Sequence, residues 1–368
     1  MAFNVTDNII NNEIDVLPLS SEEYTFIGTV LLIIIIFGTL ENGSVLIVFL
    51  KNKQLRSTTN CFIISLAVAD FAMCVFAIPV SMSSNLANRW LWGDVGCTYE
   101  GFMVYFLGLS QMYVLCAISV DRYIVIAKPL YKAKITNRVA CVSILSCWIG
   151  GFFWAIMPVF GWSSYDKEAQ GTSCTIVWQS GELSVKSYNI TIFFMCLLFP
   201  LSIMIYCYYG VFMTVKNISR NRIWDMNSRI ARRNLQIERK MAKSIALMVG
   251  TFLFSWVPYA IVSFWAAFGD ASMIPAIASA LPAILAKSST IWNPIIYFLT
   301  NNQFRSALIR LVPCANLKRY LLGKVEKDDQ QDSDTFKTTK LDTTYQTTNK
   351  INPSATISTI SYNQKQDT

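Results

Sequence analysis

The 368-residue chain contains no histidine. Histidine is the usual general base of hydrolytic enzymes and a common ligand of zinc and haem iron, so its absence excludes His-containing catalytic triads and most such metal sites. Charged residues are also scarce, at 15% of the sequence. The 31 basic residues exceed the 23 acidic ones but form no basic, aromatic-interleaved domain, which argues against nucleic acid as a partner. We predict neither an enzyme nor a metal site.

What the chain has in abundance is apolar sequence. Hydrophobic residues make up 53% of it and the mean hydropathy is +0.40, too apolar for a soluble protein of this length. Seven hydrophobic runs are each long enough to cross a membrane core about 30 Å thick. They cover residues 26–50, 61–84, 97–126, 139–162, 187–213, 243–267 and 274–299. The sequence therefore predicts an all-α membrane protein, a seven-transmembrane helix bundle.

The basic residues between the runs predict the orientation. They cluster after the first and third runs and before the sixth, whereas the remaining loops carry only Arg89, Lys167 and Lys186. The positive-inside bias then puts the N-terminus outside and the C-terminus inside. The N-terminal segment 1–25 contains a glycosylation sequon, N-V-T at Asn4, and has no apparent cleavable signal peptide. We expect a multi-pass protein with an extracellular N-terminus.

One lysine, Lys287, lies in the seventh run, with no other charged side chain between Pro275 and Leu299. At about 1.5 Å per residue it lies roughly 18 Å along the helix, near the middle of the membrane. An ionisable group at that depth is costly unless it is paired, neutral or chemically modified, so the position indicates a functional site. The alternative is a structural lysine bonded to a neighbouring carboxylate.

Short motifs surround this lysine and recur in the other runs. The seventh run reads A-K-S-S at Lys287 and N-P-I-I-Y from Asn293, and the third ends in D-R-Y. Trp148, Pro200 and the string F-S-W-V-P-Y stand in the fourth, fifth and sixth. Together they resemble the opsins, the retinal-binding branch of the rhodopsin-like G-protein-coupled receptors. G-W-S-S-Y and G-T-S-C-T-I-V-W look most like the neuropsin and peropsin groups, whereas Glu100 looks more like the vertebrate visual pattern.

The resemblance implies a retinal site. Lys287 would hold retinal, 11-cis or all-trans, as a protonated Schiff base, and burial helps because it disfavours the ammonium form of the amine. Trp256 and Tyr259 match residues of the retinal pocket. Cys97 and Cys174 match the extracellular disulfide that draws a long loop over the pocket.

A protonated Schiff base in an apolar pocket needs a carboxylate counterion. Glu100, one turn beyond Cys97, and Glu168, six residues before Cys174, both resemble counterion positions of opsins. Glu100 belongs inside the bundle and Glu168 to a loop that water reaches, so we expect Glu100 to dominate. The other acid would be a solvated rim residue.

The resemblance also implies a cytoplasmic activation switch. Arg122 would pair with Asp121 and with Glu238 in the sixth run; an ordinary surface ion pair is the alternative. The switch residues are Asp121, Arg122, Tyr123, Tyr208, Glu238, Asn293, Pro294 and Tyr297. Asn42 and Asp70 would join Asn293 in a buried polar or sodium-linked network. Glu41, beside Asn42, has no counterpart in the family pattern.

Four segments follow from this reading. The N-terminal tail covers residues 1–25, and the receptor domain covers residues 26–300. A membrane-surface amphipathic helix follows at 301–314, with Cys314 as a palmitoylation site. Residues 315–368 would form a disordered cytoplasmic tail, rich in hydroxyls that can be phosphorylated.

These features predict a light-activated receptor that drives a heterotrimeric G protein, in the plasma membrane or a photoreceptor membrane. Membrane lipids surround it, and a receptor kinase and arrestin would act through the tail. One alternative is a retinal photoisomerase of the peropsin type with little signalling. Another is a receptor for a diffusible ligand with a chance lysine at position 287.

Overall fold

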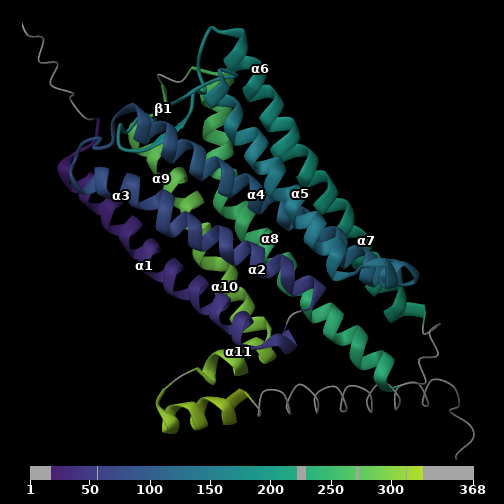
Figure 1. Ribbon diagram of the computed structural model, residues 1–368. Coiled ribbons are helices and arrows are strands. Elements are labelled where there is room, and N and C mark those ends of the chain that lie inside the picture. The colour runs from purple at the N-terminus through teal and green to yellow at the C-terminus, as the bar shows by residue number, and fades with distance from the viewer. Residues whose placement is uncertain (1–17, 56, 222–228, 271–272, 312, 326–368) are drawn as a thin grey trace, which may run out of the picture. The chain divides into compact units, whose positions relative to one another are not determined.

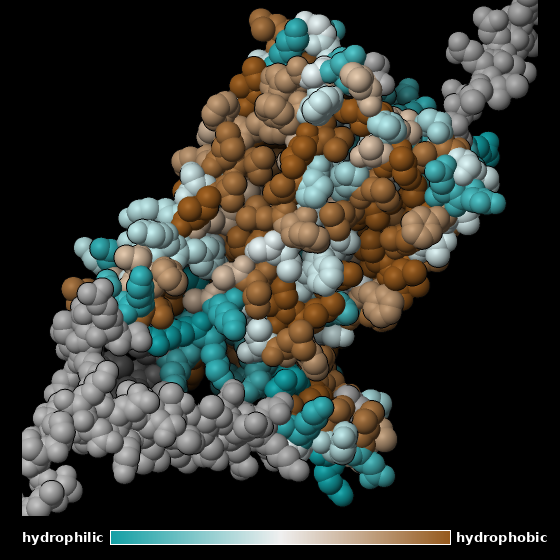
Figure 2. Space-filling model, turned by 180° about the vertical axis from the view of Figure 1, so that it is seen from behind, coloured by the Kyte–Doolittle hydropathy of each residue, from teal (hydrophilic) through white to brown (hydrophobic). Residues whose placement is uncertain are grey.

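The first six hydrophobic runs form helices long and apolar enough to cross a membrane. The computed structural model describes residues 18–55, 57–221, 229–270, 273–311 and 313–325. Within them the six spans are Ser21–Lys51, Thr58–Leu86, Gly93–Ala127, Asn137–Phe160, Leu183–Asn217 and Gln236–Phe268. Apolar side chains cover much of the face seen in Figure 2, as expected of a surface in contact with lipid.

Eight of the helices labelled in Figure 1 form these six spans. They are α1 (Ser21–Lys51), α2 (Thr58–Ala72), α3 (Ile78–Leu86), α4 (Gly93–Ala127), α5 (Asn137–Ile156), α6 (Leu183–Ile192), α7 (Phe199–Asn221) and α8 (Arg229–Phe268). A π-helical turn, Met73–Ala77, joins α2 to α3, and a second, Phe193–Leu198, joins α6 to α7. π-Turns inside helices often mark functional sites, because they rotate the residues that follow them.

The seventh run is divided in two. It forms α9 (Ala276–Lys287) and α10 (Ser289–Thr300), which meet at Ser288. Each has 12 residues, too short alone to cross a core about 30 Å thick, but together they are long enough. The chain therefore has the predicted seven-transmembrane architecture, and the break in its last span comes directly after Lys287.

Another helix supports α10 near this break. Pro294 lacks an amide N–H, so the carbonyl of Thr290, four residues earlier, has no partner within the helix. Asn42 of α1 donates its side-chain amide to that carbonyl at 2.9 Å. Asn42 is fully buried, and the bond attaches α1 to α10 inside the bundle.

A small hairpin lies at the end of the bundle where α4 begins. β1 (Tyr165–Lys167) pairs antiparallel with β2 (Cys174–Ile176). The predicted disulfide between Cys97 and Cys174 is present, with its Cα atoms 5.3 Å apart, and ties β2 to the start of α4. The sequence indicated only a loop here, because three-residue strands leave almost no periodic pattern.

Helices α4 and α5 approach closely at a glycine. A Cβ added to Gly151 would lie 2.2 Å from Ser110 Oγ and 2.8 Å from the Ser110 backbone nitrogen. Gly151→Ala should therefore lower the free energy of unfolding by about 1–3 kcal/mol, since the backbone has to move. Gly150→Ala is the control, because its Cβ would meet Tyr113 only at 3.4 Å. Thermal unfolding in detergent should separate the two variants; equal midpoints would contradict the close contact.

Residues from Asn302 onward form a second unit. It contains α11 (Asn302–Ile309) and a further helical segment at 315–325. The predicted helix over 301–314 is thus shorter, because Pro313 cannot continue it. The expectation that a disordered tail begins at 315 is wrong as far as 325, where apolar residues recur at helical spacing in N-L-K-R-Y-L-L. Cys314 is exposed, and its palmitoylation stays a prediction. Asn4 and the tail 326–368 lie outside the described residues.

Candidate functional site

Lys287, the last residue of α9, is buried inside the bundle, with 7% of its surface exposed. Its Nζ donates to Ser81 Oγ of α3 at 2.9 Å and to Ser173 Oγ of the hairpin loop at 2.9 Å. It also lies 3.1 Å from Glu100 Oε1 of α4. The amine is thus paired, as the structural-lysine alternative also expects, so the pair alone does not decide its role.

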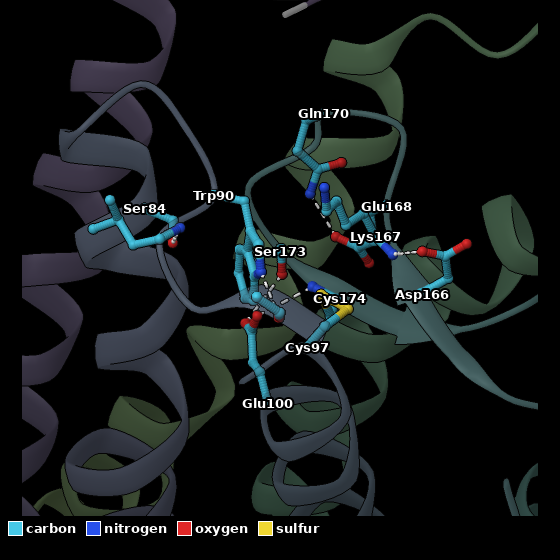
Figure 3. The surroundings of a disulfide bond; sticks show 12 residues. Ser84, Trp90, Cys97, Glu100, Asp166, Lys167, Glu168, Gln170, Ser173 and Cys174 are labelled. Atoms are coloured by element: carbon cyan, nitrogen blue, oxygen red, sulfur yellow. Dashed lines mark hydrogen bonds between the residues drawn. A yellow bond between two sulfur atoms is a disulfide. The ribbon is translucent and has the colours of Figure 1, made fainter. Parts of the chain in front are cut away.

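Glu100 is completely buried, and the hairpin positions it (Figure 3). Ser173 Oγ donates to its Oε1 and the Cys174 backbone N–H donates to its Oε2, each at 3.1 Å. The disulfide explains this arrangement, because Cys97 lies one turn before Glu100 and its partner Cys174 follows Ser173. The covalent bond therefore brings two loop donors to a carboxylate inside the helix bundle.

Glu168, the second counterion candidate, lines a cavity together with Lys287 but does not touch the lysine amine. Its side chain is half-buried. Tyr259 OH donates to its Oε1 at 3.2 Å and Gln170 Nε2 donates to its Oε2 at 2.5 Å. Burial raises the pKa of the Glu168 carboxyl above its ordinary value, whereas the Lys287 ammonium and the Gln170 hydrogen bond lower it. The sequence predicted that Glu168 is a loop acid that water reaches. Glu168 does lie in the loop, but two hydrogen bonds hold its carboxylate at the cavity, so the prediction of a solvated side chain is wrong.

Two cavities share Trp256 and Tyr259 as lining residues. One contains Lys287 and Glu168, and the other is almost wholly apolar. The apolar cavity is lined by Tyr105, Gly108, Leu109, Met112, Trp178, Ile192, Phe193, Cys196, Leu197, Phe252, Leu253, Trp256, Val257, Tyr259, Ala260 and Ser263. A Cβ at Gly108 would lie 2.8 Å from the Trp256 ring, so the glycine leaves room for that ring. The site can accept an apolar molecule with a group that reacts with an amine.

A second cluster lies where α4 ends and α8 begins. Arg122 donates to Asp121 Oδ2 from Nε at 3.0 Å and from NH2 at 2.6 Å. Its NH1 lies 2.6 Å from Glu238 Oε2, which is the pairing that the sequence predicted; we call this pair the Arg122–Glu238 latch. Thr59 also contacts the guanidinium, and Lys132 Nζ lies 2.9 Å from Glu238 Oε1. Because Arg122 is 3% exposed, the pair is not an ordinary surface pair.

The tyrosines of the predicted switch lie around this cluster without joining it. Tyr123 packs against Tyr206, with ring centroids 5.6 Å apart. Tyr208 OH accepts a long hydrogen bond from Ser119 Oγ at 3.5 Å. Tyr297 donates to Asn60 Oδ1 at 3.1 Å. The hydroxyls of Tyr208 and Tyr297 therefore each have a partner on a neighbouring helix, and Tyr123 contacts α7 through its ring.

The polar network forms around Asp70 of α2. Asn293 and Gln111 donate their side-chain amides to its two oxygens, each at 2.9 Å. Asn42 instead donates its side-chain amide to the backbone carbonyls of Gly38 and Thr290, and no described contact joins it to Asp70 directly. Two amides thus hold Asp70, and the sodium-linked form of the network stays a prediction.

Several residues of these clusters were not found from the sequence. They are Ser81, Ser173 and Gln170 at the lysine, Thr59 and Lys132 at the latch, and Gln111 at Asp70. Gln111 had a usable signal, since it is an amide inside an otherwise apolar run. Ser81 had none, because small hydroxyl residues are common in membrane helices, and Ser173 is one of several polar residues in its loop.

Comparisons with known proteins agree with this arrangement. Residues 41–297 match the family model of the 7 transmembrane receptor (rhodopsin family). The chain is 36% identical to the visual pigment-like receptor peropsin of Homo sapiens over 303 residues, which cover 80% of the chain and 86% of that protein. It is 36% identical to melanopsin of Felis catus over 304 residues, but these cover only 62% of that longer protein.

A solved structure of squid rhodopsin is similar in fold. The TM-score is 0.75 at 31% identity, over 80% of this chain and 87% of that one. The resemblance that the motifs indicated is thereby confirmed at the level of the family. The chain is a multi-pass membrane protein that belongs to the rhodopsin family of seven-transmembrane receptors and, within that family, to the opsins.

Proposed function

We propose that this opsin is a light-sensing receptor that binds retinal covalently at Lys287 and activates a heterotrimeric G protein. The observation that carries the proposal is the buried amine of Lys287 in a cavity that shares Trp256 and Tyr259 with a second, almost wholly apolar cavity. A lysine that served only to balance Glu100 would not need that space. The similarity to peropsin, melanopsin and squid rhodopsin supports the same assignment.

The residues of the site fit retinal, an apolar polyene with a terminal aldehyde. When bound, retinal supplies visible absorption and a light-driven change of shape. Lys287 provides the nucleophile, and Ser81 and Ser173 hold its Nζ in place. Glu100 provides the negative charge 3.1 Å away that favours a protonated Schiff base. Trp256 lines both cavities, and its Nε1 donates to Ser289, two residues after the lysine.

Signalling is proposed from the Arg122–Glu238 latch. It holds the cytoplasmic end of α8 against α4, and its release would let α8 move as a two-state element. A heterotrimeric G protein is the partner that such a movement serves in this family of receptors. We extend the proposal to the plasma membrane or a photoreceptor membrane, with the N-terminus outside, glycan at Asn4, palmitate at Cys314, and a receptor kinase and arrestin at the tail.

Arg122→Ala tests the signalling part. The variant should keep a normal dark spectrum, because Arg122 lies outside both cavities, but should lose light-driven nucleotide exchange. The measurement is nucleotide exchange on purified G proteins of several classes, before and after illumination. Lys132→Gln is the control, because it removes an exposed cation from Glu238 and leaves Arg122 in place; it should change the rate by less than about threefold.

The same assay distinguishes the photoisomerase. A wild-type pigment that isomerises retinal on illumination but activates no G-protein class would contradict the signalling proposal. In that case the latch would be a structural contact, and its loss would change the unfolding temperature without changing the photochemistry.

A further inference from the structure

Gln170, in the loop between β1 and β2, is held from three directions. It is 3% exposed. Its backbone carbonyl accepts a hydrogen bond from Tyr24 OH of α1 at 2.6 Å, and its side-chain Oε1 accepts from Ser279 Oγ of α9 at 3.2 Å. Its Nε2 donates to Glu168 Oε2 at 2.5 Å, which Figure 3 shows as a dashed line. Both side-chain groups and the backbone carbonyl of this buried glutamine therefore have partners.

These bonds determine which way the amide faces. A Ser279 hydroxyl that donates to Oε1 leaves the NH₂ group directed at Glu168, and an NH₂ group can only donate. Glu168 receives a second donor, Tyr259 OH, at its other oxygen. A carboxylate with a neutral donor at each oxygen is stabilised in its charged form.

The groups that face Glu168 come from three helices and its own loop. Lys287 of α9 contributes a positive charge, Glu100 of α4 a negative one, and Tyr259 of α8 and Gln170 contribute donors. Burial and Glu100 favour the neutral carboxyl, while Lys287, Gln170 and Tyr259 favour the anion. Gln170 has no other contact with the lysine cavity among the described residues, so it acts on that cavity only through Glu168.

We infer that Gln170 is a positioning residue that directs the Glu168 carboxylate into the Lys287 cavity and stabilises it as an anion, which gives the site a second negative group beside Glu100. The inference concerns the protein's own residues, and its role in a pigment rests on the function proposed above. Glu100 contacts the Lys287 amine directly. Glu168 acts on the amine from further away, and Gln170 and Tyr259 hold its carboxylate in position.

The first test uses the full-length protein without retinal. The carboxylic-acid C=O band of Glu168 is identified in infrared spectra as the band that Glu168→Gln removes, and its titration midpoint is measured. Gln170→Met, which keeps the side-chain length and removes the donor, should raise that midpoint by about one pH unit. The sign follows because the lost bond favoured the anion.

Thr172→Val is the matched control in the same loop. Thr172 is completely buried and donates to Asn85 Oδ1 at 3.0 Å, so the variant removes a buried hydrogen bond without touching either carboxylate. Its Glu168 midpoint should stay within about 0.3 pH units of the wild type. Equal shifts in both variants would mean that Gln170 only stiffens the loop, and an unchanged midpoint in Gln170→Met would also overturn the inference.

The second test uses the pigment, in a Glu100→Gln background where Glu168 is the remaining carboxylate. Adding Gln170→Met should lower the pH at which the visible band gives way to ultraviolet absorption, again by about one unit, and adding Thr172→Val should not. If the wild type forms no pigment, the proposed function fails while the infrared result still decides the role of Gln170. If the pigment forms and the pH profile does not move, the positioning role fails and the retinal site stands.

Discussion

Lys287→Ala should give a folded protein that carries no covalently bound retinal. Among the lysines whose burial the structure describes, Lys287 alone is buried, so no other amine lies inside the bundle to replace it. The measurement is the spectrum of protein incubated with retinal, before and after hydroxylamine, together with the mass of the acid-denatured protein. The wild type should gain the mass of a retinylidene group, and the variant should gain nothing.

Loss of the amine also leaves Glu100 without its cation, and this has to be separated from loss of the attachment site. Removing one partner of a buried ion pair costs about 3–5 kcal/mol, because the other charge stays buried. Lys287→Arg is the matched control, since arginine keeps a positive charge near Glu100 but does not form an imine under these conditions. Both variants should lack the adduct, and Lys287→Arg should unfold at the higher temperature.

An adduct that persists in acid-denatured Lys287→Ala protein would move the attachment site elsewhere. A wild-type protein that forms no adduct at all would favour the receptor for a diffusible ligand. In that case Lys287 would be a structural lysine, and its only measurable role would be the stability difference between the two variants.

The sequence predicted the parts of the site that short motifs or strong physical penalties mark. Lys287 was found because a charge in the middle of an apolar span is costly, and the two cysteines because they match a family pattern. Asp70 and Arg122 were found because they match motifs of the family. Each of these residues can be recognised from the few residues that flank it in the sequence.

Contacts between distant segments were not predictable in this way. Ser81 and Ser173 reach the lysine from positions 206 and 114 residues away, and Gln170 reaches Ser279 across 109. Such partners depend on how the hairpin folds over the bundle, which the disulfide and two three-residue strands decide. The break at Ser288 was also missed, because an apolar run reads the same whether it forms one helix or two.

The segment from Lys287 to Pro294 joins the two halves of the proposed mechanism. Thr290 Oγ1 donates to the Lys287 carbonyl at 3.0 Å, and the Thr290 carbonyl accepts from Asn42. One turn further, Asn293 donates to Asp70. A displacement of the lysine would therefore act on α1 and α2 through a few hydrogen bonds in one broken helix, without a separate relay.

The two carboxylates near Lys287, Glu100 and Glu168, should differ strongly in their effect on the spectrum. Glu100 is fully buried and 3.1 Å from the amine, whereas Glu168 is half-buried and has no direct bond to it. Coulomb attraction at 4 Å falls from an upper bound of about 20 kcal/mol in a dry interior to about 1 kcal/mol in water, so the closer and drier acid should dominate. Glu100→Gln should therefore lower the pH midpoint of the visible band by at least about two units and move dark absorption at neutral pH toward the ultraviolet.

Glu168→Gln is the matched comparison, because it makes the same chemical change near the same lysine. Its midpoint should fall by no more than about one unit, so that the visible band persists at neutral pH. A pH titration of the dark spectrum of each variant measures both values. The opposite result, a visible band kept in Glu100→Gln and lost in Glu168→Gln, would make the loop acid the counterion. The contact between Glu100 and Lys287 would then belong to the free amine alone, and Gln170 would control the main charge of the site through Glu168.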